Sequence, residues 1–310
     1  MQLCHDLLRL GDESEGWRLA ADVFSADPYS VVAHNLLTLK DRIDGFRTLE
    51  GDGLIVRMDA HEAEIYGTQT LDLLKLAKKT LCAKYDVQLK KPIVIEIFPE
   101  QKDFAIRTFG LPGGAGFLGV CFGRVVTANS PASQGESPSN WQAVLWHEFC
   151  HVVTLEKTNN KMPRWLSEGI SVFEEKQKNA TWGQSMNPRY RQMILGDELT
   201  PVSQLSSAFL KPSSPIHLQF AYYESALVVE YLVEKHGLDA LKKILTDLGL
   251  GMSANDCLSL HIGSLDQLDR EFTDFARAKA HSLAPNADWE TSELPEDADL
   301  ESLSEWNAQH

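Results

Sequence analysis

Two histidines near the middle of the chain have the spacing of a metal site on a helix. His147 and His151 are four residues apart in the phrase HEFCH, so on an α-helix they share one face and lie one turn apart, where both imidazoles can bind a single ion. Glu148 points about 60° away from His151 around that helix. We therefore expect it to flank the ion as a general base instead of binding it. The phrase is short enough to occur by chance, so its surroundings must decide.

The surroundings predict a buried helix. Ser139 and Gln142 have the spacing of a capping box at its start. The positions around the motif carry the apolar residues Val144, Leu145, Phe149, Val152 and Val153. These residues place the helix in a core, where imidazoles need polar partners. The alternative is a surface helix with two solvated histidines.

A third protein ligand is expected, because catalytic zinc usually has three protein ligands and one open position. After a polar turn at 157–161, Pro163 begins a second helix that has Glu168 on its first turns. Two antiparallel helices joined by so short a loop would return Glu168 to the histidines. The alternative is an exposed helical glutamate, and we expect Glu174 and Glu175 on the solvated face of this second helix.

The flanking segments predict an α+β fold. Residues 63–85 have the pattern of a long helix, and the β-branched phrase PIVIEIF at 92–98 that of a strand. A glycine-rich stretch at 110–123 leads into a second expected strand at 124–128; glycine clusters usually serve turns, so an ordinary surface loop and hairpin is the alternative. We expect a small mixed β-sheet over the HExxH helix, followed by a mostly helical C-terminal lobe, with the site in the cleft between them.

The phrases HEFCH and PRWLSEGIS together resemble the gluzincins, the thermolysin-like zinc peptidases with two histidines and a downstream glutamate, and especially their bacterial peptidase-MA-like branch. The likeness extends over about 92–284. It implies a thermolysin-like fold that hydrolyses peptide or protein substrates, with Zn²⁺ held by His147, His151 and Glu168. Glu148 would be the base and proton shuttle. In such folds an edge strand pairs with the substrate backbone, which implies this role for the strand expected at 124–128.

A later helix, FAYYESALVVEYLVEKHG, ends at Gly237 as at a C-cap glycine. It resembles the helix from which the aminopeptidase branch of the gluzincins supplies a tyrosine to the oxyanion. The resemblance implies Tyr222 for this role, with Tyr223 as the second choice. A phenol can donate one hydrogen bond where negative charge develops; the alternative is that both tyrosines pack in the core. His217 lies nearby and receives no role.

Two positions depart from the family pattern. Thermolysin-like enzymes often carry a carboxylate four residues beyond the glutamate ligand, where it orients the first histidine, but Val172 occupies that position. The partner of His147 is therefore not identified. The aminopeptidase branch binds a free substrate amine through a Gly-x-Met-Glu-Asn phrase, and the corresponding GAGFLGVCFGRVV has no glutamate. An endopeptidase is thus favoured over an aminopeptidase.

The N-terminal segment predicts a helix-turn-helix on either side of Asp27-Pro28, over about 16–43. It resembles one tetratricopeptide unit, and such arrays usually need about three copies. No second full copy is present, so either the pair packs on the following domain or the chain is part of a longer one. The segment 300–310 is a candidate for the opening helix of another repeat. The rival hypothesis is therefore a zinc-containing scaffold that binds peptides without cutting them, with a protein partner at the helical repeat.

Four parts follow from these patterns. We predict a tetratricopeptide-like helical pair at 1–48, an α+β metallopeptidase subdomain with the zinc motif at 49–182, and a helical subdomain at 183–284. An acidic tail or linker completes the chain at 285–310.

The composition excludes other classes of protein. With 44 acidic and 29 basic side chains the formal charge is −15, which argues against a nucleic-acid partner. The last 31 residues contain eight acidic and no basic side chains, so much of this excess lies in the predicted tail. Apolar runs are too short for a transmembrane span.

The start of the chain and its cysteines bear on localisation. MQLCHDLLRLGDESEG lacks the features of a signal peptide. Five scattered cysteines favour free thiols over a disulfide framework. We expect a cytoplasmic protein if Met1 is the true start, and a bacterial cell-envelope protein if the chain is truncated.

Overall fold

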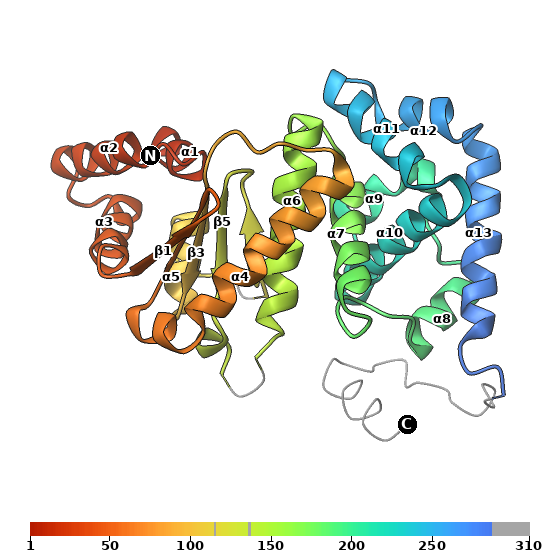
Figure 1. Ribbon diagram of the computed structural model, residues 1–310, viewed down its shortest axis with the longest axis horizontal. Coiled ribbons are helices and arrows are strands. Elements are labelled where there is room, and N and C mark those ends of the chain that lie inside the picture. The colour runs from red at the N-terminus through yellow and green to blue at the C-terminus, as the bar shows by residue number, and fades with distance from the viewer. Residues whose placement is uncertain (115, 136–137, 287–310) are drawn as a thin grey trace.

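The computed structural model describes residues 1–114, 116–135 and 138–286. The segment 300–310, and all but two residues of the predicted tail, lie outside these ranges. Within them the chain forms a small mixed sheet flanked by helices, followed by a helical lobe (Figure 1). The predicted α+β fold is confirmed.

The sheet has five strands in the order β1-β2-β3-β5-β4. Parallel pairing joins β2 to β3 and β3 to β5, whereas the outer pairs β1/β2 and β4/β5 are antiparallel. The bounds are β1 (Arg47–Gly51), β2 (Leu54–Met58), β3 (Ile93–Phe98), β4 (Gly119–Cys121) and β5 (Val125–Asn129).

The strand expected at 124–128 is present as β5, but its expected place at the sheet edge is wrong. β5 pairs on both sides, and the three-residue strand β4 forms the edge instead. All five residues of β5 are buried, as expected of a strand that is covered on both faces. A tight turn that contains Gly123, with a φ of 89°, folds part of the glycine-rich stretch back along β5 as β4.

Two long helices cover one face of the sheet. They are α4 (Ala60–Tyr85) and α6 (Trp141–Thr158), and they also pack on each other. Leu81 and Tyr85 of α4 join Phe149 of α6 in the main hydrophobic core. This core fixes the position of α6, the helix that carries the histidines.

The opposite face is covered by α5 (Gln101–Phe109) and by the N-terminal helices α1 (Gln2–Arg9), α2 (Glu13–Ala26) and α3 (Val31–Ile43) (Figure 1). The expected helix-turn-helix is present as α2 and α3. Arg107 and Glu96, each at most 1% exposed, pair at 2.7 Å, and Arg57 bridges Glu96 and Glu13 at 3.3 and 2.7 Å. A buried charge is stable only when it is paired, so this network ties α2 to the sheet.

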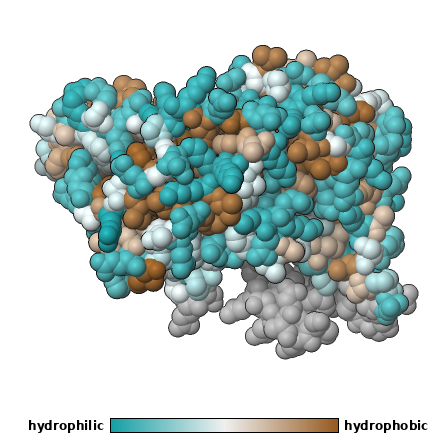
Figure 2. All heavy atoms as spheres, in the orientation of Figure 1, coloured by the Kyte–Doolittle hydropathy of each residue, from teal (hydrophilic) through white to brown (hydrophobic). Residues whose placement is uncertain are grey.

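Helix α7 (Arg164–Lys178) follows α6, and the helical lobe packs on it through the long helix α10 (Pro215–His236), which ends before Gly237 as expected. The other helices of the lobe are α8 (Pro188–Leu195), α9 (Ser206–Leu210), α11 (Leu238–Leu250), α12 (Ala254–His261) and α13 (Leu265–Ser282). Figure 2 shows apolar side chains in small scattered patches among polar ones on the face of the molecule in view. Across the described ranges, every helix is too short or too polar to span a bilayer.

Candidate metal centre

Helix α6 starts one residue later than the sequence predicts. Asn140 is its N-cap, and the side-chain oxygen accepts hydrogen bonds from the backbone N–H groups of Gln142 and Ala143 at 3.0 and 3.2 Å. The predicted Ser139–Gln142 capping box is therefore wrong. The backbone N–H of Ser139 instead donates to Gln134 before the helix begins.

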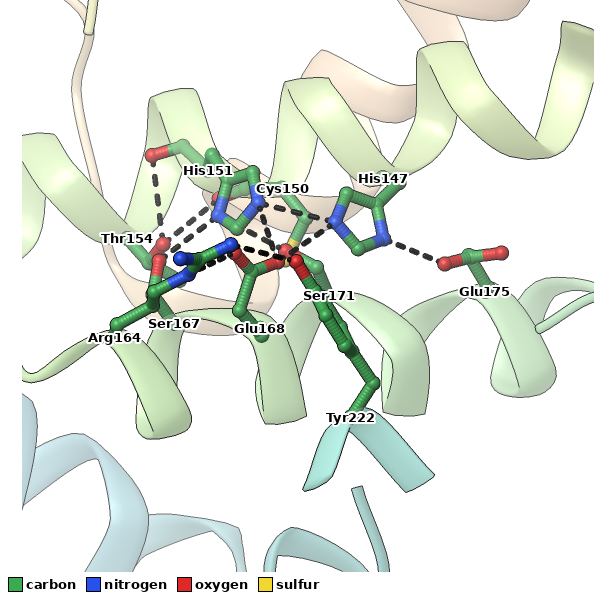
Figure 3. Close-up of polar contacts among 10 residues, drawn as sticks. All are labelled: His147, Cys150, His151, Thr154, Arg164, Ser167, Glu168, Ser171, Glu175 and Tyr222. Atoms are coloured by element: carbon green, nitrogen blue, oxygen red, sulfur yellow. Dashed lines mark hydrogen bonds and ion pairs between the residues drawn. The ribbon is translucent and has the colours of Figure 1, made fainter. Parts of the chain in front are cut away.

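The turn between α6 and α7 brings the second helix back over the first. Asn159 and Asn160 have φ values of 49° and 58°, so two successive residues are left-handed and reverse the chain within a few positions. Pro163 occupies the N-cap of α7. As Figure 3 shows, Glu168 reaches from α7 toward the two histidines of α6, as predicted.

Three candidate ligand atoms converge at this point. The distances are 3.0 Å between His147 Nε2 and His151 Nε2, 3.3 Å between His147 Nε2 and Glu168 Oε2, and 3.4 Å between His151 Nε2 and Glu168 Oε2. Ligands about 2.0–2.1 Å from a tetrahedral zinc ion lie roughly 3.3–3.4 Å from one another. The two distances to Glu168 fit this geometry and the distance between the two nitrogens is slightly shorter, so the group could hold a metal ion.

The outer nitrogens of the two imidazoles support the same interpretation. His147 Nδ1 lies 2.6 Å from Glu175 Oε1, and His151 Nδ1 lies 2.8 Å from Ser167 Oγ and 3.2 Å from Ser171 Oγ. A carboxylate only accepts hydrogen bonds, so His147 donates its Nδ1 proton to Glu175. In the neutral imidazole, the Nε2 lone pair of His147 then faces His151 Nε2 and Glu168 Oε2, where a metal ion could bind.

Glu174 and Glu175 do not lie on a solvated face, so that prediction is wrong. Their exposed fractions are 2% and 8%, because α7 packs on α6 on one side and on α10 on the other. Glu174 accepts a hydrogen bond from Tyr85 and pairs with Lys84, both at 2.6 Å. Glu175 lies seven residues beyond Glu168, about two helical turns, which places both on one face. This seven-residue spacing could have predicted from the sequence that Glu175 lies on the same helical face as Glu168.

Glu148 is 7% exposed and lies against the edge strand β4. A Cβ atom on Gly119 would lie 2.7 Å from Glu148 Cγ and 2.8 Å from Oε1, so only glycine allows β4 this close. Burial raises the pKa of Glu148. The role of Gly119 was not foreseen in the sequence.

His147, His151 and Glu168 line a cleft of about 720 Å³, together with residues of β4, α6 and α7 and with Tyr222 of α10. Tyr222 Oη accepts a hydrogen bond from Arg164 Nη2 at 2.8 Å. Tyr223 instead stacks on Tyr190, with ring centroids 4.9 Å apart, and is 5% exposed. His217 pairs with Glu198 at 3.1 Å and lines a different cavity. Of the two candidate tyrosines, the structure brings Tyr222 to the cleft.

Arg164, the first residue of α7, is a further residue of the centre that the sequence did not predict. Its Nε lies 3.3 Å from Glu168 Oε1, and its guanidinium group lies 5.4 Å from the centre of the Phe209 ring. The side chain thus connects the phenol of Tyr222 to the carboxylate of Glu168 (Figure 3). Its position at the N-terminus of α7, one turn before Glu168, was the available signal.

The electrostatics of the centre favour positive charge. Burial alone would lower the pKa of His147, but Glu168 and Glu175 hold it well above its ordinary value. Burial would likewise raise the pKa of Glu168, yet its contacts with the two imidazoles hold that pKa far below its usual range. Such a site stabilises a cation that lies among these three side chains.

A family model of the peptidase MA superfamily matches residues 68–276. The chain belongs to the peptidase MA superfamily. No curated protein matches the chain. The part that matches the superfamily begins within α4 and includes α6, α7 and α10, whereas α1–α3 and the β1-β2 hairpin precede it. Peptidase MA proteins are typically metal-dependent peptidases, and the His147, His151 and Glu168 group fits that chemistry.

Proposed function

We propose that this chain is a zinc-dependent endopeptidase in which His147, His151 and Glu168 hold the metal and Glu148 is the general base. One observation carries the proposal: three ligand atoms lie 3.0–3.4 Å apart beside a buried glutamate in an open cleft. A bound zinc ion would supply Lewis acidity for activating water and polarising the scissile carbonyl group.

Glu148 serves as the proton carrier. Its carboxylate takes a proton from the attacking water and passes it to the leaving amine nitrogen. Glu148 is 7% exposed and lines the same cleft as His147, His151 and Glu168, which supports its taking up this proton and returning it later. Gly119 supports this role because its missing side chain leaves room for the carboxylate.

Tyr222 stabilises the oxyanion that forms when water adds to the carbonyl carbon. Arg164 donates to Tyr222 Oη at 2.8 Å, so the phenol accepts this bond through oxygen and keeps its own proton for the substrate. A single donor of this kind contributes about 2.7–4 kcal/mol in comparable sites.

The substrate backbone pairs with β4, which takes the role first expected of the strand at 124–128. Leu118 C=O accepts from Asn129 N–H, and Phe122 N–H donates to Val125 C=O, both at 2.8 Å. In an antiparallel ladder the intervening residues Gly119 and Cys121 direct their main-chain groups to the other side. An extended peptide can add there as a further strand.

The lining of the cleft favours cleavage within a chain. Among the described lining residues, the carboxylates are Glu148, Glu168 and Glu175, and all three belong to the proposed metal centre. No fourth carboxylate among those described lining residues is left to bind a free amino terminus. This supports an endopeptidase over an aminopeptidase.

The test compares zinc content and hydrolysis of internally quenched peptides blocked at both ends. We expect Glu148→Gln to keep zinc and lose at least 99% of the activity, and His147→Ala to lose both. Glu156→Gln, an exposed position on the same helix, should match the wild type. Full activity in Glu148→Gln would contradict the mechanism, and absence of zinc from the wild type would contradict the site. Bound zinc with no cleavage of a broad peptide library would favour the non-catalytic scaffold instead.

A further inference from the structure

A second cavity of about 370 Å³ adjoins the metal cleft. Its lining includes Asp6, Arg9 and Leu10, at the C-terminal end of α1 and just after it. Two of its other residues, Cys121 of β4 and Leu155 of α6, also line the metal cleft. The two cavities therefore follow one another along the same strand and helix.

We propose that α1 forms the far end of one continuous substrate cleft, and that the chain binds extended peptides of about six or more residues. This inference rests on the proposed peptidase function and specifies its class of substrate. It also gives α1, which precedes the part matched to the superfamily, a role in substrate binding.

The length of β4 determines how many residues of a bound peptide separate Glu148 from α1. Gly119 lies against Glu148, whereas Phe122, just after β4, lies under the guanidinium group of Arg9, which is 5.2 Å from the ring centre. Three residues of strand span about 10 Å. A peptide paired with β4, with its scissile bond at Glu148, thus places a residue three or four positions away beside α1.

Several hydrogen bonds hold the end of α1 in place. Arg9 Nη2 donates to Thr108 C=O at 2.7 Å, and Arg107 Nη2 donates to Leu8 C=O at 3.2 Å. Arg124 donates to Leu10 C=O and pairs with Asp12 at 2.8 Å. Because these bonds already hold the end of α1 in place, binding a peptide does not carry the cost of ordering this segment.

The exposed surface at this end of the cleft is largely apolar. Leu10 is 56% exposed, and Phe122 is partly exposed beside it. Arg9 already donates to Thr108 and lies 3.9 Å from Asp6, so its charge is paired. We therefore assign this end to an apolar side chain of the substrate.

The experiment measures binding of fluorescent peptides to the Glu148→Gln variant by anisotropy, so that binding is observed whether or not the wild type cleaves. Four-residue peptides are compared with peptides extended by four residues, ending in leucine, on either side. We expect extension on one side to tighten binding about tenfold. Leu10→Asp should remove most of that gain, and the milder Leu10→Ala about half.

Leu3→Asp is the matched control, because Leu3 lies on α1, is 63% exposed and is absent from the lining of both cavities. It should keep the full gain. No gain on extension, or a gain that persists in a folded Leu10→Asp variant, overturns the inference. If the gain and its loss are observed but the wild type cleaves no peptide, the cleft stands and the proposed activity fails.

Discussion

Glu175 holds the outer nitrogen of His147 at 2.6 Å, while Glu168, two turns earlier on the same helix, contacts the inner nitrogen at 3.3 Å. Two carboxylates on one face of α7 thus contact the two nitrogens of a single imidazole. Metal-bound histidines normally donate their second N–H to such a partner, and the thermolysin-like position for it is the buried apolar residue Val172. In this chain the carboxylate that contacts His147 belongs to Glu175, three residues after Val172.

Replacing Glu175 by glutamine should weaken zinc binding about 10- to 100-fold, because the charged acceptor that orients His147 and raises its basicity becomes a neutral, weaker one. The affinity is measured by competition with a chromophoric chelator. Glu174→Gln is the matched control, since Glu174 contacts Tyr85 and Lys84 instead of a histidine. It should lower the unfolding temperature without changing the zinc affinity, and equal affinities in all three proteins would contradict the assignment.

Replacing Tyr222 by phenylalanine should lower kcat about 100- to 1,000-fold with zinc content and KM little changed, because the lost hydrogen bond forms in the transition state. Steady-state kinetics on one blocked peptide check this. Tyr223→Phe removes a hydroxyl whose contact is Met186 Sδ at 3.7 Å, so it should keep nearly normal kcat. The reverse ranking of the two variants would reassign the oxyanion contact.

Gly119→Ala should lower kcat/KM at least tenfold, because the new methyl group would lie 2.7 Å from Glu148 Cγ and displace the carboxylate; a shift of about 1 Å at a reacting group can cost 100-fold. Zinc content should remain normal. Gly45→Ala, after α3 and away from the cleft, should retain activity. Wild-type kinetics in Gly119→Ala would show that the contact between β4 and Glu148 is unimportant.

Acidification should destabilise the N-terminal helices through His5, which is 6% exposed. Burial, with Arg9 and Arg107 nearby, lowers the pKa of His5 to about 4. In the unfolded chain the pKa is about 6.5, so that state binds more protons between these values, and the free energy of unfolding falls as the pH drops from 6.5 toward 4. The full effect is about 3 kcal/mol.

The check on His5 is urea unfolding at pH 7 and pH 4.5. His5→Gln cannot gain that proton, so its loss of stability between the two pH values should be smaller than that of the wild type. Identical losses in the two proteins would remove His5 as the cause.

The convergence of His147, His151 and Glu168 could be predicted from the sequence because its geometry is local. His147 and His151 are one helical turn apart wherever that helix lies, and a short loop limits where the next helix can place Glu168. The same local periodicity predicted the long helices α4, α6 and α10 and the buried strand β3, since each pattern repeats within one continuous segment.

Contacts between distant segments were decided by the tertiary structure alone. Whether β4 or β5 forms the sheet edge depends on pairing with β3, which lies far away in sequence. Tyr222 and Tyr223 differ by about 100° around one helix, and only the packing of α10 on α7 selects which of them faces the cleft. Glu175 is buried for the same kind of reason, and α1 reaches the cleft because the N-terminal helices dock on the sheet. A periodic pattern shows which face of an element is apolar, but the chain must fold before that face has a neighbour.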